Sequence, residues 1–131
     1  MNQRNGLVFF LVFLLSCIFL CNPAAVWAND TVTLQVIGDD DRGIMLEETK
    51  ISFEKGDTAL SILLRKFGKE KVIVRGGLSH GYVEEVDGLW AGQRGPLSGW
   101  MYEVNGKNPD VDAGSTKLKP GDKLIWEYVR R

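Results

Sequence analysis

The sequence predicts an α+β fold in which a mixed sheet of four to five strands packs on one short helix. Two observations carry this prediction. Residues 31–37 and 123–129 alternate between side chains of different polarity, which is the period of a pleated strand with two different faces. Residues 60–67 instead place apolar side chains at the spacing of one helix face. A helix this short must bury its apolar face against the sheet, which gives two layers around one core.

The first half of the domain is expected to be a hairpin followed by the helix. The segment 44–53 also alternates, so we expect it to pair with 31–37 across the loop 38–43. A side-chain oxygen of Thr58 or Asp57 can cap the helix, because it accepts from the free N–H groups of the first turn. The helix should end at Gly68. Four residues form its apolar stripe: Leu60, Leu63, Leu64 and Phe67.

Three adjacent carboxylates, Asp39 to Asp41, lie in the loop of that hairpin. A calcium site is one interpretation, since hard cations take oxygen ligands. The twelfth position counted from Asp39 is Lys50, however, where an EF-hand has a glutamate. A solvated turn is therefore the favoured interpretation.

The second half is expected to hold three further segments. Residues 71–75 form a short strand, and 76–97 form an irregular stretch in which Tyr82 and Val83 lie on a minor strand. A loop of this length in a small domain is often functional. Residues 99–105 form a strand that runs into an Asn-Gly turn. The order of elements matches the β-grasp arrangement, with the first and last long strands parallel and side by side in the middle.

The first 28 residues have the pattern of a secretory signal peptide. Arg4 precedes an uncharged apolar run from Leu7 to Cys21, and small residues before Asn29 suit a signal peptidase. An uncleaved anchor is the alternative, because counting on to Ala28 nearly reaches the about 20 residues of a spanning helix. A lipoprotein signal at Cys17 fits less well. We therefore expect a mature domain over 29–131, secreted or at the cell surface, with no membrane span after cleavage.

Composition argues against several classes of function. Without Arg4 the chain keeps 15 of its 16 basic residues against 17 acidic ones, a net charge of −2. This balance does not favour nucleic acid or an anionic membrane as a partner. Both cysteines lie in the signal, and His80 is the only histidine, so the usual zinc sites are not expected. A Gly-x-Ser-x-Gly motif is absent. We expect no enzyme activity, no metal and no cofactor.

The aromatic residues are the candidates for binding. Aromatic faces can hold flat ligands, but a small sheet also needs large side chains in its core. At least two of the four strand aromatics, Trp100, Tyr102, Trp126 and Tyr128, are expected to be core. Trp90 differs because it lies in a Gly-rich loop. The residues expected to bind a ligand are Tyr82, Trp90, Trp100 and His80.

Three phrases of the chain resemble one family. They are Gly56-Asp57-Thr58-Ala59-Leu60, Ser98 to Gly106 (SGWMYEVNG), and Leu118 to Tyr128 (LKPGDKLIWEY). In this order and spacing they resemble the bacterial exported domain of unknown function described as transcobalamin C-terminal-like, over about residues 31–129. The resemblance implies a β-grasp fold. In the animal cobalamin carriers such a domain closes over one side of the corrinoid, and a helical barrel supplies the other.

The resemblance therefore implies cobalamin, or another corrinoid, as the candidate ligand. The 103 residues after the signal leave no room for a helical barrel, so a partner protein would supply the other half of the site. We expect an exported, non-catalytic module that binds a small ligand. The alternative is a cell-surface protein-interaction or structural module without a small-molecule ligand, which would add a strand to a partner at an exposed sheet edge.

Overall fold

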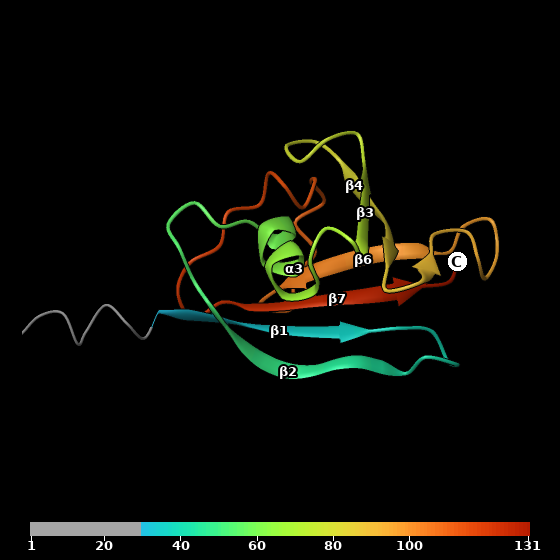
Figure 1. Cartoon of the computed structure of the whole chain (residues 1–131), viewed down its shortest axis with the longest axis horizontal. Helices are drawn as coiled ribbons and strands as arrows, with labels where there is room; N and C mark the ends of the chain where they lie inside the picture. Colours follow the sequence, from blue (N-terminus) through green and yellow to red (C-terminus); the bar gives the residue numbers. More distant parts are fainter. Residues whose placement is uncertain (1–29) are drawn as a thin grey trace, which may run out of the picture.

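The computed structural model describes residues 30–131, so the predicted signal peptide, its cleavage site and both cysteines lie outside the described residues. The described chain forms one helix and seven strands, in an order that follows the sequence prediction closely (Figure 1). The elements are β1 (Thr31–Ile37), β2 (Ile44–Ser52), α3 (Ala59–Phe67), β3 (Val72–Arg75), β4 (Tyr82–Val86), β5 (Leu89–Trp90), β6 (Gly99–Val104) and β7 (Lys123–Val129). Within these residues, no helix is long and apolar enough to cross a membrane.

The main sheet has the strand order β2-β1-β7-β6. The central pair, β1 and β7, runs parallel, and the two outer strands pair antiparallel to them. This is the predicted β-grasp arrangement, with the first and last long strands side by side. Helix α3 lies across one face of the sheet (Figure 1).

The core lies between that face and the helix. Its largest fully buried side chain is Trp126 on β7, whose Nε1 donates to the carbonyl oxygen of Ala59 at 3.1 Å. Tyr102 and Tyr128 are buried beside it, so three of the four strand aromatics are core, as expected. The apolar positions that alternate in β1 are fully buried in the same layer: Val32, Leu34 and Val36.

The helix begins where the sequence predicted. Thr58 is its N-cap and forms a reciprocal capping box with Ser61, and the N–H of Gly68 closes the last turn on Leu64. The capping box satisfies two donors of the first turn that have no partner within the helix. The helix start is also tied to the segment before β7, because Thr58 forms an isolated antiparallel bridge with Lys117.

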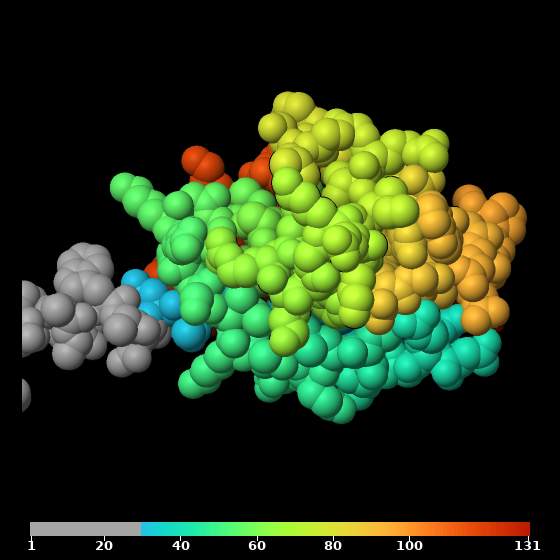
Figure 2. Space-filling view, viewed as in Figure 1, coloured from blue at the N-terminus to red at the C-terminus, as the bar shows by residue number. Residues whose placement is uncertain are grey.

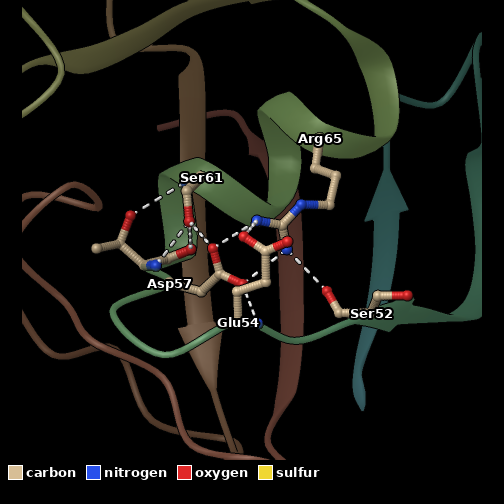
Figure 3. Close-up of polar contacts among 6 residues, drawn as sticks. Ser52, Glu54, Asp57, Ser61 and Arg65 are labelled. Atoms are coloured by element: carbon tan, nitrogen blue, oxygen red, sulfur yellow. Dashed lines mark hydrogen bonds and ion pairs between the residues drawn. The ribbon is translucent and has the colours of Figure 1, made fainter. Parts of the chain in front are cut away.

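Asp57 fixes the turn that precedes the helix (Figure 3). Its two carboxylate oxygens accept from the two Nη atoms of Arg65, each at 2.7 Å, and Ser61 Oγ donates to Oδ1 at 2.9 Å. Arg65 also reaches the carbonyl oxygen of Ser52 at the end of β2. Burial alone would raise the pKa of Asp57, but hydrogen bonds from Arg65, the Glu54 N–H and Ser61 outweigh it and hold the pKa below its usual value. The cluster joins β2, the turn and the helix.

A second, three-stranded sheet has the order β3-β4-β5 and packs above β6. The minor strand expected at Tyr82 and Val83 is confirmed as the start of β4, whereas the expectation that the following residues up to Trp90 are irregular was wrong. Asp87 and Gly88 both have positive φ, at 47° and 90°, which closes a two-residue hairpin between β4 and β5. An Asp-Gly pair between short apolar segments is a known hairpin signal, so the sequence contained the information for this element.

The acidic loop between β1 and β2 also differs from the prediction of a solvated turn. Asp39 is buried and forms an ion pair with Arg94 Nε, while Asp41 lies 3.0 Å from Arg94 Nη2. Burial alone would raise the pKa of Asp39. Hydrogen bonds from the Arg42 N–H and the Arg94 guanidinium outweigh this effect and hold the pKa below its usual value. Figure 2 shows the loop that joins β5 to β6, in orange, directly above this β1–β2 loop, in cyan. The carboxylates thus hold the two loops together.

Candidate functional site

A cleft lies beside β6, the edge strand of the main sheet. It has a volume of about 300 Å³. One wall is β6, a second is the start of β4, and the third is the segment that follows the Asn105-Gly106 turn. The residues that line it are Gly81, Tyr82, Val83, Trp100, Met101, Tyr102, Asn108, Asp110, Val111, Asp112, Ala113 and Trp126.

The floor of the cleft is a pair of buried aromatic rings. Tyr102 and Trp126 lie opposite each other on β6 and β7, with ring centroids 5.2 Å apart. The Tyr102 hydroxyl donates to the carbonyl oxygen of Val111 at 2.6 Å and lies 2.6 Å from Thr116 Oγ1. Burial raises the pKa of Tyr102, and the Asp112 carboxylate adds to the rise while the Thr116 contact opposes it. The phenol is therefore a neutral anchor that ties the outer wall of the cleft to β6.

Trp100 forms one side of the cleft and is held from behind. Its Nε1 donates to the carbonyl oxygen of Leu89 at 2.9 Å. Its ring meets Tyr128 edge-on, with centroids 5.4 Å apart and planes at 77°. These contacts fix the indole in one orientation, so it is a rigid half-buried surface at the cleft.

Tyr82, the first residue of β4, also lines the cleft and is 54% exposed. It follows Gly81, where a Cβ would collide with the carbonyl oxygen of Gly77 and with Val74. Only glycine allows the loop between β3 and β4 to turn this closely into β4. The turn therefore determines where the tyrosine ring enters the cleft wall.

His80 lies at the rim and is not one of the lining residues. Its Nδ1 is 3.5 Å from Asp112 Oδ2, and the histidine side chain is 80% exposed. The same loop is fastened by Ser115, whose Oγ donates to the Ser79 carbonyl oxygen at 3.0 Å. A Cβ at Gly114 would collide with the carbonyl of Leu78, so this approach too requires glycine. The contacts join the β3–β4 loop to the 112–115 turn.

Trp90 lies outside the cleft lining. It pairs with Glu85 across the β4–β5 hairpin, and its carbonyl oxygen accepts from the Tyr128 hydroxyl at 2.7 Å. Trp90 is 41% exposed and is not among the residues that line the cleft. Of the four residues that the sequence singled out, the structure brings Tyr82 and Trp100 to one cleft, places His80 beside it, and leaves Trp90 out.

The sequence reasoning missed the polar wall of the cleft. Asn108, Asp110 and Asp112 line it, and none of the lining residues is basic. The N–H of Asp110 donates to Asn108 Oδ1 at 2.9 Å, and Asp110 has a φ of 57°. Asparagine and aspartate around a proline are typical of a turn, but nothing in that signal places the turn against β6.

The described residues contain no group of three or more His, Cys, Asp and Glu side chains placed to hold a metal ion. In the β1–β2 loop, the Asp39 and Asp41 carboxylates that suggested calcium instead converge on Arg94.

A family model described as "Domain of unknown function (DUF4430)" matches residues 56–130, which is more than half of the chain. The chain belongs to the DUF4430 family. The match starts at Gly56, just before the helix, and continues through β7, so it includes every residue that lines the cleft. Comparison with curated proteins gives no match.

Two solved structures share the fold of this DUF4430 domain. One, from Ruminococcus gnavus ATCC 29149, is described as a "putative metal binding protein"; it is 18% identical, with a TM-score of 0.56, over 79% of this chain and 99% of that one. The other is haptocorrin in complex with Cbi, which is 16% identical with a TM-score of 0.62. That match covers 77% of this chain, which spans only 25% of haptocorrin. At these identities the likeness establishes the fold.

Proposed function

We propose that this DUF4430 domain is a non-catalytic ligand-binding module that acts outside the cytoplasm, with its ligand in the cleft beside β6. The observation that carries the proposal is the cleft itself. Two aromatic residues from different sheets, Tyr82 and Trp100, line it over the buried floor of Tyr102 and Trp126. Concave sites with aromatic walls and a few placed polar groups are the usual form of small-molecule sites.

A corrinoid is the first candidate ligand. The fold is shared with part of haptocorrin, which was solved with Cbi. A volume of about 300 Å³ is at the lower limit of sites that enclose a drug-sized ligand. A corrinoid is larger than that, so the cleft would hold one edge of the macrocycle and leave the rest for a partner protein. The predicted half-site agrees with this size argument.

The residues with shifted pKa values support the non-catalytic part of the proposal, because their side chains bind other residues of the fold. Asp39 and Asp57 have lowered pKa values, and each is bound by an arginine within the fold. Tyr102 has a raised pKa, and its hydroxyl is bound to Val111 and Thr116. These shifts serve internal contacts, whereas a catalytic group must present its proton or lone pair to a substrate.

The direct test is a titration of the purified protein with cobinamide and with cobalamin, followed by calorimetry and by tryptophan fluorescence corrected for ligand absorbance. Saturable binding in the micromolar range or tighter supports the proposal. Tyr82→Ala should then weaken binding, because its exposed ring borders the cleft. Trp90→Ala is the matched control, because that exposed ring lies outside it.

The two variants also distinguish the cleft from Trp90, which the sequence predicted as a ligand-binding residue. If Trp90→Ala weakened binding and Tyr82→Ala did not, the ligand would lie at the β4–β5 hairpin and the cleft assignment would be wrong. Absence of binding at millimolar corrinoid would remove the direct form of the proposal.

A further inference from the structure

The cleft occupies the place of a missing strand. Asn105 and Gly106, with φ of 52° and 82°, form a two-residue turn that closes on the Val104–Lys107 bridge. A hairpin of this kind normally continues with the second strand beside the first. Here it stops after one bridge, because Pro109 has no N–H to donate and Asp110 adopts positive φ. The chain leaves β6, and the space beside the strand becomes the cleft.

The edge of β6 that faces this space has free backbone groups. Val104 exchanges both its backbone hydrogen bonds with Lys107, on the side opposite β7, while the N–H of Asn105 donates to Lys123 at the start of β7. Backbone groups alternate in direction along a strand, so the N–H and C=O of Trp100 and Tyr102 also point away from β7. In the part of the chain that the structure describes, these four groups have no hydrogen-bond partner.

The polar wall opposite this edge carries negative charge. Asp110 and Asp112 line the cleft, and neither forms an ion pair with a lysine or arginine of residues 30–131. Asp112 is 45% exposed and its only ion-pair partner in this set is His80. A ligand in the cleft thus meets two free donors and two free acceptors along one side and carboxylates along the other.

We propose that the cleft binds an extended peptide segment of a partner protein, which adds to β6 as an antiparallel strand and directs a lysine or arginine toward Asp110 and Asp112. Strand addition uses backbone hydrogen bonds for affinity and neighbouring side chains for specificity. The segment takes the position that the interrupted hairpin leaves open. Two of its residues, separated by one intervening residue, pair with Trp100 and Tyr102. This inference does not depend on corrinoid binding.

The first experiment uses a capped heptapeptide of threonine and valine with a central lysine, labelled with fluorescein and measured by polarisation. Two analogues of this peptide carry backbone N-methyl groups. In the first the odd-numbered residues are methylated, which blocks one edge of the extended peptide; in the second the even-numbered residues are methylated, which blocks the other edge. Because only one edge pairs with β6, one analogue should lose binding by tenfold or more and the other should bind like the parent. Equal binding of both analogues, or no binding of the parent at millimolar concentration, would refute strand addition.

The second experiment tests the charge. Asp110→Asn and Asp112→Asn should each weaken binding of the lysine peptide by about two- to fivefold, as expected for exposed ion pairs. A norleucine peptide should not distinguish these variants from the parent protein. Glu47→Gln is the matched control, since Glu47 is an exposed carboxylate on β2 without a side-chain partner among the described residues. Equal binding of lysine, norleucine and glutamate peptides would refute the basic partner.

NMR spectra of the backbone amides test whether the peptide binds at the free edge of β6. The amide protons of Trp100 and Tyr102 should move downfield and gain exchange protection when the peptide binds, whereas those of Met101 and Glu103, which face β7, should change little. The reverse pattern would place the peptide elsewhere. Self-association of the protein at the same concentrations, with no peptide effect, would mean that a second copy of the chain is the occupant and would overturn the proposal. Cobinamide titration reads the proposed small-ligand function separately.

Discussion

Replacing Tyr102 by phenylalanine removes the hydroxyl that ties the floor of the cleft to its outer wall. The ring can stay in place against Trp126, so the change isolates the polar contact. The lost contacts are the bond to the Val111 carbonyl oxygen and the one with Thr116 Oγ1, both 2.6 Å long. A neutral hydrogen bond contributes about 0.5–1.5 kcal/mol net. Thr116 Oγ1 keeps its 3.4 Å contact with the Asp112 carbonyl oxygen, so we expect a loss of about 1–2 kcal/mol in the free energy of unfolding.

Tyr128→Phe provides the matched control. Its hydroxyl also makes two contacts, with the Trp90 carbonyl oxygen at 2.7 Å and with Ser98 Oγ at 2.9 Å, but outside the cleft. Both variants should lower the midpoint of thermal unfolding, by about 4–8 °C per kcal/mol for a domain of this size. Only Tyr102→Phe should speed amide exchange over residues 108–116, by about 5- to 30-fold, because only this variant lowers the free energy of local opening of that segment.

The measurement is hydrogen exchange by mass spectrometry together with calorimetry on the two variants. Unchanged exchange over 108–116 in Tyr102→Phe would show that the hydroxyl does not hold this wall. The same acceleration in Tyr128→Phe would show that the segment responds to global stability rather than to its own contact. Either result would refute the reasoning that the phenol shapes the cleft.

Three further predictions concern the contacts around the core. Because the pKa values of Asp39 and Asp57 are lowered in the folded state, the unfolded chain binds more protons than the folded one in acid. The free energy of unfolding should therefore stay level near neutral pH and fall as the pH drops below about 3.8. Urea unfolding at pH 7 and at pH 3 measures this difference. Asp57→Asn should cost about 1.5–3 kcal/mol at pH 7 and reduce that acid dependence, and an unchanged pH profile would contradict the assignment. Gly114→Ala should cost about 1–3 kcal/mol in thermal unfolding through collision with the Leu78 carbonyl, whereas Gly99→Ala, whose Cβ would lie 3.6 Å from Ala91, should cost clearly less.

Much of the main sheet and the helix could be predicted because their signals are local. The alternation in 31–37 and 123–129 gave both central strands with the correct bounds, and the spacing from Leu60 to Phe67 gave the helix. The capping residues lie next to the elements that they end, so Thr58 and Gly68 could also be found. Periodicity and end signals of this kind depend on neighbours within one or two turns of chain.

Long-range contacts could not be predicted from such signals. The Asp39–Arg94 pair joins residues 55 positions apart, so an acidic triplet that looked solvated is partly buried. Trp90 looked available for binding because it lies among glycines, but pairing across the β4–β5 hairpin places it away from the cleft. The polar wall at Asp110 and Asp112 depends on where the chain goes after the Asn105-Gly106 turn, which no local pattern determines.

The central position of β7 affects the order in which this protein can fold during synthesis. Among the strands of residues 30–131, β1 pairs only with β2 and β7, and β6 pairs only with β7, so the two sides of the sheet have no direct contact through strand pairing. A ribosome-bound chain that ends before Lys123 would hold the β1–β2 hairpin and β6 as separate pieces, without Trp126 to fill the space under the helix. The main sheet can therefore close only after β7 has emerged. Such dependence on pairing between distant segments slows folding and keeps the nascent chain open until then.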